Sequence, residues 1–159
     1  MHNIIKDQKI CANEWQVWRD TEELPKTGGY IVPLSLWQNN KDSLKALGNI
    51  AVFLANDESP KALAAEIQDF DVIAVDFPKF ADGRGFSYGR ELREQLGYQG
   101  ELRAIGDFIR DQLYFLSRCG FNSFALENND LEESLASFQD FSESYQPSID
   151  QRLPLFRRR

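Results

Sequence analysis

The sequence predicts an α/β fold, because strand and helix patterns alternate along most of the chain. Apolar runs suited to buried strands begin near residues 50, 72, 102 and 121, and a helical pattern fills each interval. Runs that are apolar on both faces and joined by helices are typical of parallel strands with right-handed crossovers. The repeated βα units are fewer than the eight of a complete barrel. We therefore expect a mainly parallel sheet that is either open or an incomplete TIM-like barrel.

The segments outside these repeats define the expected domain organisation. Residues 3–19 alternate loosely around a break at residues 11–14, which predicts an N-terminal β-hairpin or a pair of edge strands. Residues 20–29 are polar and contain proline and glycine, so we expect a linker there. The chain then divides into an N-terminal hairpin and linker (1–29), a single α/β domain (30–146) and a C-terminal tail (147–159).

Short apolar runs and capping residues mark the individual elements. A strand is expected over residues 30–34, where Pro33 lacks an N–H group and therefore favours an edge position. Ser59 and Pro60 suit the N-cap and first position of a helix, while Ser87 and Asp107 are expected to cap two others. The remaining strands are expected at 50–54, 72–75, 102–105 and 121–126, and the helices at 42–47, 60–70, 87–96, 107–119 and 130–145.

The charge of the chain argues against two classes of partner. The formal net charge is −7 and the pI is about 4.8. Nucleic acids and anionic membranes both favour a basic surface, so we expect neither as a partner. No apolar run approaches the roughly 20 residues that span a bilayer, and the first residues lack the apolar core of a signal peptide. We therefore expect a cytoplasmic protein.

The cysteine and histidine content disfavours several kinds of metal and cofactor site. Cys11 and Cys119 form no Cys-x-x-Cys motif, which argues against an iron–sulfur cluster or a zinc ribbon. The single histidine is His2, so any histidine-based catalysis would have to use the N-terminal segment. We expect no cofactor.

Polar residues follow the predicted strands at their carboxyl ends, where α/β proteins usually bind ligands. Asp76 directly extends one apolar strand and Glu127 extends another, so both carboxylates begin near the protected interior. With Lys79 they are the candidate catalytic residues of a small barrel-like lyase or isomerase. In that alternative they transfer protons or bind a divalent metal such as Mg²⁺.

Residues 76–90 combine three glycines with two arginines directly after a strand. Glycine allows close approach of the backbone, and arginine binds planar anions through a rigid fork of donors. This composition favours an oxyanion pocket, with a loosely spaced dinucleotide fingerprint and a tight connection as alternatives. In the oxyanion pocket Arg84, Arg90 and Arg103 engage the anion, and Asp76, Asp82 and Asp107 orient the arginines. Gly83, Gly85 and Ser87 supply the backbone and helix-cap groups.

Several blocks of residues resemble one bacterial family. They are Asp76-Phe-Pro, Asp82-Gly-Arg-Gly-Phe-Ser, Arg90-x-Leu-Arg, Gly100-x-Leu-Arg-Ala-x-Gly, Asp107-x-x-x-Asp-Gln and Cys119-Gly-Phe. Together they are similar to family 934 among the bacterial domains of unknown function, over roughly residues 30–145. Members of this family are encoded beside assimilatory sulfite reductase and are labelled oxidoreductases of sulfite reduction.

The resemblance implies a cytoplasmic accessory protein of sulfate assimilation and sulfite reduction. Its partner would be a sulfite reductase component, and its ligand a small anion such as sulfite or sulfate. The chain has no flavin, sirohaem or iron–sulfur signature of its own, so whether it is an enzyme stays open. A non-catalytic assembly factor is a further alternative. The small number of βα units also favours association of two copies into a homodimer.

Overall fold

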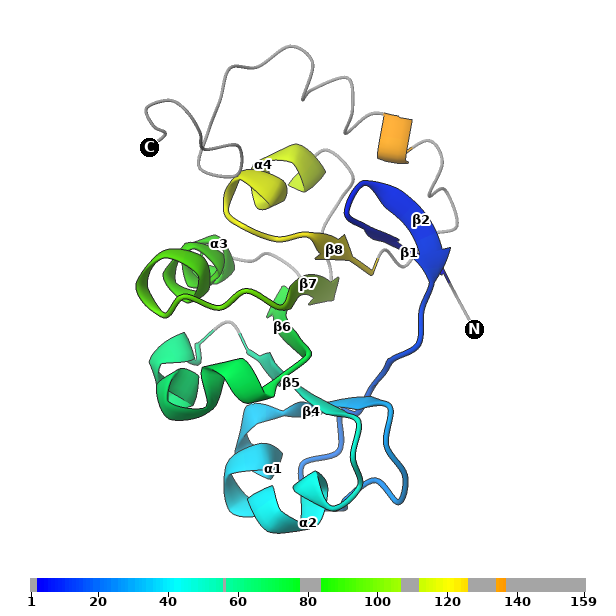
Figure 1. The fold of residues 1–159 in the computed structure, drawn as a ribbon, viewed down its shortest axis with the longest axis vertical. Coiled ribbons are helices and arrows are strands. Elements are labelled where there is room, and N and C mark those ends of the chain that lie inside the picture. Colours follow the sequence, from blue (N-terminus) through cyan, green and yellow to red (C-terminus); the bar gives the residue numbers. More distant parts are fainter. Residues whose placement is uncertain (1–2, 56, 78–83, 107–111, 126–133, 137–159) are drawn as a thin grey trace.

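The computed structural model describes residues 3–55, 57–77, 84–106, 112–125 and 134–136. These residues form a mixed α/β fold around an eight-stranded sheet with the order β2-β1-β8-β7-β6-β5-β4-β3 (Figure 1). The prediction of an α/β fold is confirmed. The strands are β1 (Asn3–Lys6), β2 (Lys9–Ala12), β3 (Gln16–Val17), β4 (Tyr30–Pro33), β5 (Ile50–Leu54), β6 (Val72–Phe77), β7 (Glu101–Gly106) and β8 (Ser123–Phe124).

Helical segments connect the strands from β4 to β8, and Figure 1 shows them on one side of the sheet. None of the helices in the described part of the chain is long and apolar enough to cross a membrane. The segments are α1 (Leu34–Asn39), α2 (Lys41–Lys45), the 3₁₀ helix η1 (Pro60–Asp69), α3 (Arg84–Arg90), the π-helix η2 (Glu91–Gln95) and α4 (Leu113–Arg118).

The sheet is parallel from β3 to β8 and becomes antiparallel at the N-terminal hairpin, because β1 runs antiparallel to both β2 and β8. The expected hairpin is present, but its turn is not at residues 11–14. Asp7 and Gln8 form a two-residue loop in which both φ angles are positive, at 53° and 65°. Two positive φ angles match the twist of the flanking strands, which is why such loops close hairpins.

The connection between β2 and β3 forces the sheet to curl. These strands are the two edges of the sheet, yet residues 13–15 alone separate them along the chain. In a flat sheet, strand spacings of about 4.8 Å would place the two edges roughly 34 Å apart. The connection can reach about 15 Å at most. The sheet is therefore an open, curled half-barrel. Of the two architectures expected from the sequence, it corresponds to the incomplete barrel.

The two faces of the sheet carry two separate apolar clusters. The larger cluster packs against the helices, with Leu63 and Leu92 fully buried among its members. The smaller one lies on the opposite face, and Trp15 from the connection after β2 packs against it. Since that connection spans the curled sheet, the smaller cluster lines its concave face. The concave cluster consists of Ile31, Ala51, Phe53, Val72, Ala74 and Ile105.

Two of the expected helix caps can be compared with the structure. Ser59 caps η1 as expected, since its hydroxyl accepts a 3.2 Å hydrogen bond from the Lys61 N–H. Ser87, in contrast, is no cap, because α3 begins at Arg84 and Ser87 lies inside it. The third expected cap, Asp107, lies outside the described residues, as does most of the helix expected at 130–145.

The edge position expected from Pro33 is wrong for the strand as a whole, because β4 is not an edge strand. Pro33 stands in β4, which β3 covers on one side. However, β3 pairs only with Tyr30 and Ile31, so Pro33 lies beyond the end of β3. The missing donor therefore interrupts no pairing on that side of β4.

Arg93 ties together the connections that precede β7 and β8. Its guanidinium donates hydrogen bonds to the carbonyl oxygens of Tyr98, Gly100 and Gly120, each at 2.9 Å, and to Asn122 Oδ1 at 3.2 Å. Asn122 Oδ1 also accepts a 2.8 Å hydrogen bond from the Leu102 N–H. The arginine thus has a structural role at the amino-terminal edge of the sheet.

We expect Arg93→Met to lower the free energy of unfolding by about 2–3 kcal/mol, because it leaves several half-buried acceptors without their charged donor. The matched control is Arg90→Met, one turn earlier. Arg90 is exposed and has a 3.7 Å ion pair with Glu94, so its loss should change the free energy by less than about 0.5 kcal/mol. Urea denaturation of both variants measures the difference, and equal effects would contradict the role given to Arg93.

Candidate functional site

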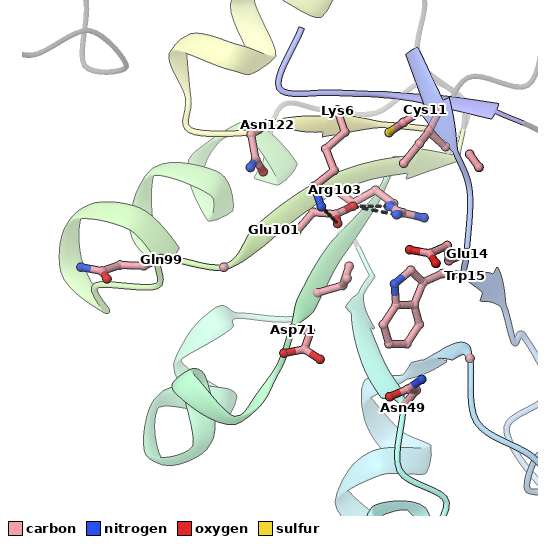
Figure 2. Close-up of a pocket in the computed structure, with 15 residues that line it drawn as sticks. Lys6, Cys11, Glu14, Trp15, Asn49, Asp71, Gln99, Glu101, Arg103 and Asn122 are labelled. Carbon is pink, nitrogen blue, oxygen red and sulfur yellow. Dashed lines mark hydrogen bonds and ion pairs between the residues drawn. The ribbon is translucent and has the colours of Figure 1, made fainter. Parts of the chain in front are cut away.

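A cavity of about 770 Å³ opens on the concave side of the sheet (Figure 2). It lies at the amino-terminal ends of the parallel strands, since Asn49 precedes β5, Asp71 precedes β6 and Glu101 begins β7. The β1–β2 hairpin adds Lys6 and Cys11 to its wall. The connection between β2 and β3 adds Glu14 and Trp15.

Glu101 binds two cations at the wall of this cavity (Figure 2). Its Oε2 atom accepts hydrogen bonds from Arg103 Nε at 2.9 Å and from Arg103 Nη2 at 2.7 Å. Its Oε1 atom lies 3.2 Å from Lys6 Nζ. The Arg103 and Glu101 side chains are 3% and 8% exposed, whereas the Lys6 side chain is 42% exposed. Lys6 is therefore the cation of the group that a solute can reach.

The sequence places this group on the concave face by strand alternation. Glu101 and Arg103 are separated by one residue of β7, so both side chains point to the same side of the sheet. A buried arginine needs an anionic partner, and Glu101 supplies it from the neighbouring position on the same face.

Asn13 connects the buried arginine to the chain that crosses the cavity. Its Oδ1 atom accepts hydrogen bonds from Arg103 Nη1 and from the Trp15 N–H, both at 2.9 Å. The connection of residues 13–15 is thereby attached to β7. The Trp15 ring extends from this connection toward the cavity (Figure 2).

The ion group changes the proton affinity of its members. Burial raises the pKa of Glu101, but the charge of Arg103, the Ser123 hydroxyl, hydrogen bonds from Arg103 and the charge of Lys6 lower it more, so the pKa lies below its ordinary value of 4.5. The carboxylate of Glu101 in turn raises the pKa of Lys6 above 10.5. Both side chains are therefore charged at neutral pH.

Two further carboxylates line the cavity, those of Glu14 and Asp71. Both residues are exposed, and neither carboxylate has an ion-pair partner among the described residues. The described residues do not form a group of three or more histidine, cysteine or acidic side chains placed to hold a metal ion. The cavity is thus a site of mixed charge, with an aromatic wall at Trp15.

Asp76 lies at the other end of the concave face, where β6 finishes. Its two carboxylate oxygens pair with Arg19, at 3.0 Å from Nη1 to Oδ2 and 3.3 Å from Nη2 to Oδ1. The Arg19 guanidinium also lies 5.5 Å from the centre of the Phe53 ring. The candidate catalytic residue Asp76 is therefore placed beside an arginine that the sequence did not single out.

Much of the glycine-rich segment lies outside the described residues. This holds for Lys79, Glu127 and the candidate anion-binding residues Asp82, Gly83 and Asp107, while Arg84 is described in its backbone only. The described part has a packing role. A Cβ atom at Gly85 would collide with the Phe77 ring, and one at Gly89 would collide with Phe121. These two glycines let α3 lie close to the sheet.

The structure does not bring together Arg90 and Arg103, two of the arginines expected at one anion. Ser87 and Arg90 are exposed on α3, on the helix-covered side of the sheet, and Arg90 faces Glu94. Arg103 lies on the concave side and is buried against Glu101. The separation follows from strand alternation, because Arg103 shares its face with Glu101, whereas α3 packs on Phe77 of the opposite face.

The sequence reasoning missed Lys6, Asn13 and Glu101. It looked for the site at the carboxyl ends of the strands, whereas the cavity lies at their amino ends and includes one of the candidates, Arg103. One signal was available. Two opposite charges at alternate positions of an otherwise apolar strand, Glu101 and Arg103, indicate an ion pair on one face of the sheet.

Fold and site together define a small mixed α/β protein with a curled, open sheet and a polar cavity on its concave face. The chain belongs to the family described as bacterial protein of unknown function (DUF934), whose model matches residues 51–156. This confirms the resemblance seen in the residue blocks. We found no match to the chain among curated proteins or among solved structures.

Replacing Glu101 should make stability less dependent on acid pH. Because folding lowers the pKa of Glu101, its contribution is complete above the ordinary value of 4.5 and is lost as the pH falls through the folded value. At pH 7 we expect Glu101→Gln to lower the free energy of unfolding by about 3 kcal/mol, since Arg103 stays buried without its anion.

The difference in the free energy of unfolding between Glu101→Gln and the unchanged protein should shrink as the pH falls below the ordinary pKa of 4.5 and through the folded value. Urea denaturation at several pH values measures this difference. Glu94→Gln is the control, because the Glu94 side chain is 42% exposed and pairs with Arg90 at 3.7 Å. A difference that stays constant down to acid pH would contradict the charged state assigned to Glu101.

Proposed function

We propose that the protein is an accessory protein of assimilatory sulfite reduction that binds a metabolite through an anionic group at Lys6. The first part rests on what the resemblance of the residue blocks implies, since the description of the matching family assigns no function. The second part rests on one observation: the cavity contains an exposed ammonium group that a buried ion pair holds in place.

Lys6 suits this role better than Arg103. The guanidinium of Arg103 directs two nitrogens to Glu101 and the third to Asn13, and its side chain is 3% exposed. The ammonium of Lys6 carries three donors and, among the described residues, has one ion pair, with Glu101 at 3.2 Å. An incoming anion can therefore bind to Lys6 without removing the carboxylate that positions it.

The size of the cavity favours an organic metabolite over a bare oxyanion. Its volume of about 770 Å³ falls within the roughly 300–1,000 Å³ of sites for small organic molecules. A sulfite or sulfate ion would contact only a small part of this wall. The Trp15 ring adds the kind of apolar surface that organic ligands cover on binding.

Catalysis by Asp76 has less support. Both of its oxygens already have a charged partner in Arg19, so the carboxylate is not directed at the cavity or at any other candidate catalytic residue that the structure describes. We therefore place the function at the amino-terminal cavity.

The proposal predicts that ligand binding depends on Lys6. Calorimetric titration with sulfite, sulfate, adenylylated sulfate and L-cysteine should show tighter binding of an organic ligand than of either inorganic ion. Lys6→Gln should weaken that binding at least tenfold, because it removes the accessible cation. Lys61→Gln is the matched control, since Lys61 is exposed on η1, which covers the opposite face.

The role in sulfite reduction has a separate test in cells. Deletion of the gene from its bacterial host should prevent growth on sulfate or sulfite and permit growth on sulfide. A gene copy with Lys61→Gln should restore growth, and one with Lys6→Gln should not. Unchanged growth on sulfite would refute the role, whereas growth restored by both copies would refute the site and favour direct docking to the reductase.

A further inference from the structure

The charges that line the cavity are of both signs. Lys6 and Arg103 share the single carboxylate of Glu101, so this group has one net positive charge. Glu14 and Asp71 add two negative charges with no ion-pair partner among the described residues. Asp71 directly precedes β6 and lies apart from the β1 residue Lys6 (Figure 2).

This distribution disfavours a ligand that is only an anion. An anion at Lys6 would be attracted by one net positive charge and repelled by two carboxylates within the same cavity, which is partly shielded from water. A ligand that is only a cation would leave Lys6 unmatched. A ligand with both an anionic group and an ammonium group can pair with Lys6 and with the carboxylates of Glu14 and Asp71 at the same time, and it adds no net charge.

Trp15 contributes to the same preference. Its ring borders the cavity, and an ammonium group over the face of a tryptophan ring is attracted by the ring quadrupole. The position of the ring is restrained, because Asn13 Oδ1 binds both the Trp15 N–H and Arg103 Nη1. The ion group that presents Lys6 to the anion therefore also holds the aromatic wall in place.

We infer that the ligand of this cavity is a zwitterion, with a carboxylate or similar anion at Lys6 and an ammonium group at Asp71, Glu14 and the face of Trp15. The inference rests on the proposed function, because it takes Lys6 as the binding site of the anionic group. It goes beyond that function by naming the chemical class of the ligand, which is that of an amino acid.

Two matched sets of probes test this inference by calorimetry. The first set is L-cysteine, 3-mercaptopropionate and 2-mercaptoethylamine, studied in the presence of a reductant. The second set is 4-aminobutyrate, butyrate and butylamine. Its zwitterion, 4-aminobutyrate, has a longer separation between its two charges than L-cysteine has. In at least one set the zwitterion should bind at least tenfold more tightly than both of its singly charged analogues.

Variants of the acidic wall separate this inference from the proposed function. Asp71→Asn should weaken binding of the preferred zwitterion at least fivefold and leave binding of its anionic analogue unchanged or stronger. Asp69→Asn is the control, because Asp69 is an exposed acid two residues away that does not line this cavity. Both variants remove one negative charge, so a general charge effect would act on both.

The outcomes of these titrations are distinct. If the anionic analogues bind as tightly as the zwitterions and the binding depends on Lys6, the zwitterion inference is wrong and the proposed function stands. If no probe of either set binds, the inference is wrong. If the zwitterion binds but Asp71→Asn and Asp69→Asn behave alike, the acidic wall has been assigned incorrectly.

Discussion

The structure depends on one constraint of chain length, namely that three residues join the opposite edges of an eight-stranded sheet. This connection cannot span a flat sheet, so the sheet curls and gains a concave side. The same connection then crosses the concave side and packs Trp15 against the concave cluster. A sheet of fewer strands could be joined by three residues without curling. A longer connection would not have to run straight across the concave side, where it now carries Trp15 to the cavity.

The buried ion pair follows from this geometry. Inside a closed barrel the position of Arg103 would be filled by apolar neighbours, and a charge there would be costly. In the open half-barrel Arg103 borders a cavity. Its guanidinium donates a hydrogen bond to Asn13 of the connection and pairs with Glu101, which also pairs with Lys6 of the hairpin. The incomplete closure of the sheet is thus what permits a polar site at the amino ends of its strands.

The sequence was sufficient for the class of fold, and it was insufficient for the site. Apolar runs at 50–54 and 72–75 predicted buried strands correctly, because burial on both faces leaves a continuous apolar pattern. The position of Lys6 beside Glu101 depends on the pairing of β1 with β8, which joins residues more than a hundred positions apart. No local pattern encodes such a pairing, so the hairpin was recognised but its place in the sheet was not.

The glycine-rich segment shows why a composition typical of ligand binding can have another cause. Gly85 and Gly89 meet the physical requirement for close approach, but the approaching groups are the rings of Phe77 and Phe121. Arg90 on α3 then lies on the helix-covered side, whereas Lys6 of β1 and Arg103 of β7 lie on the concave side. Close backbone approach is a property that glycine offers equally to a ligand and to a neighbouring side chain. Whether a glycine meets a ligand or a side chain depends on which face of the sheet its helix covers, and that face is set by the topology of the whole sheet.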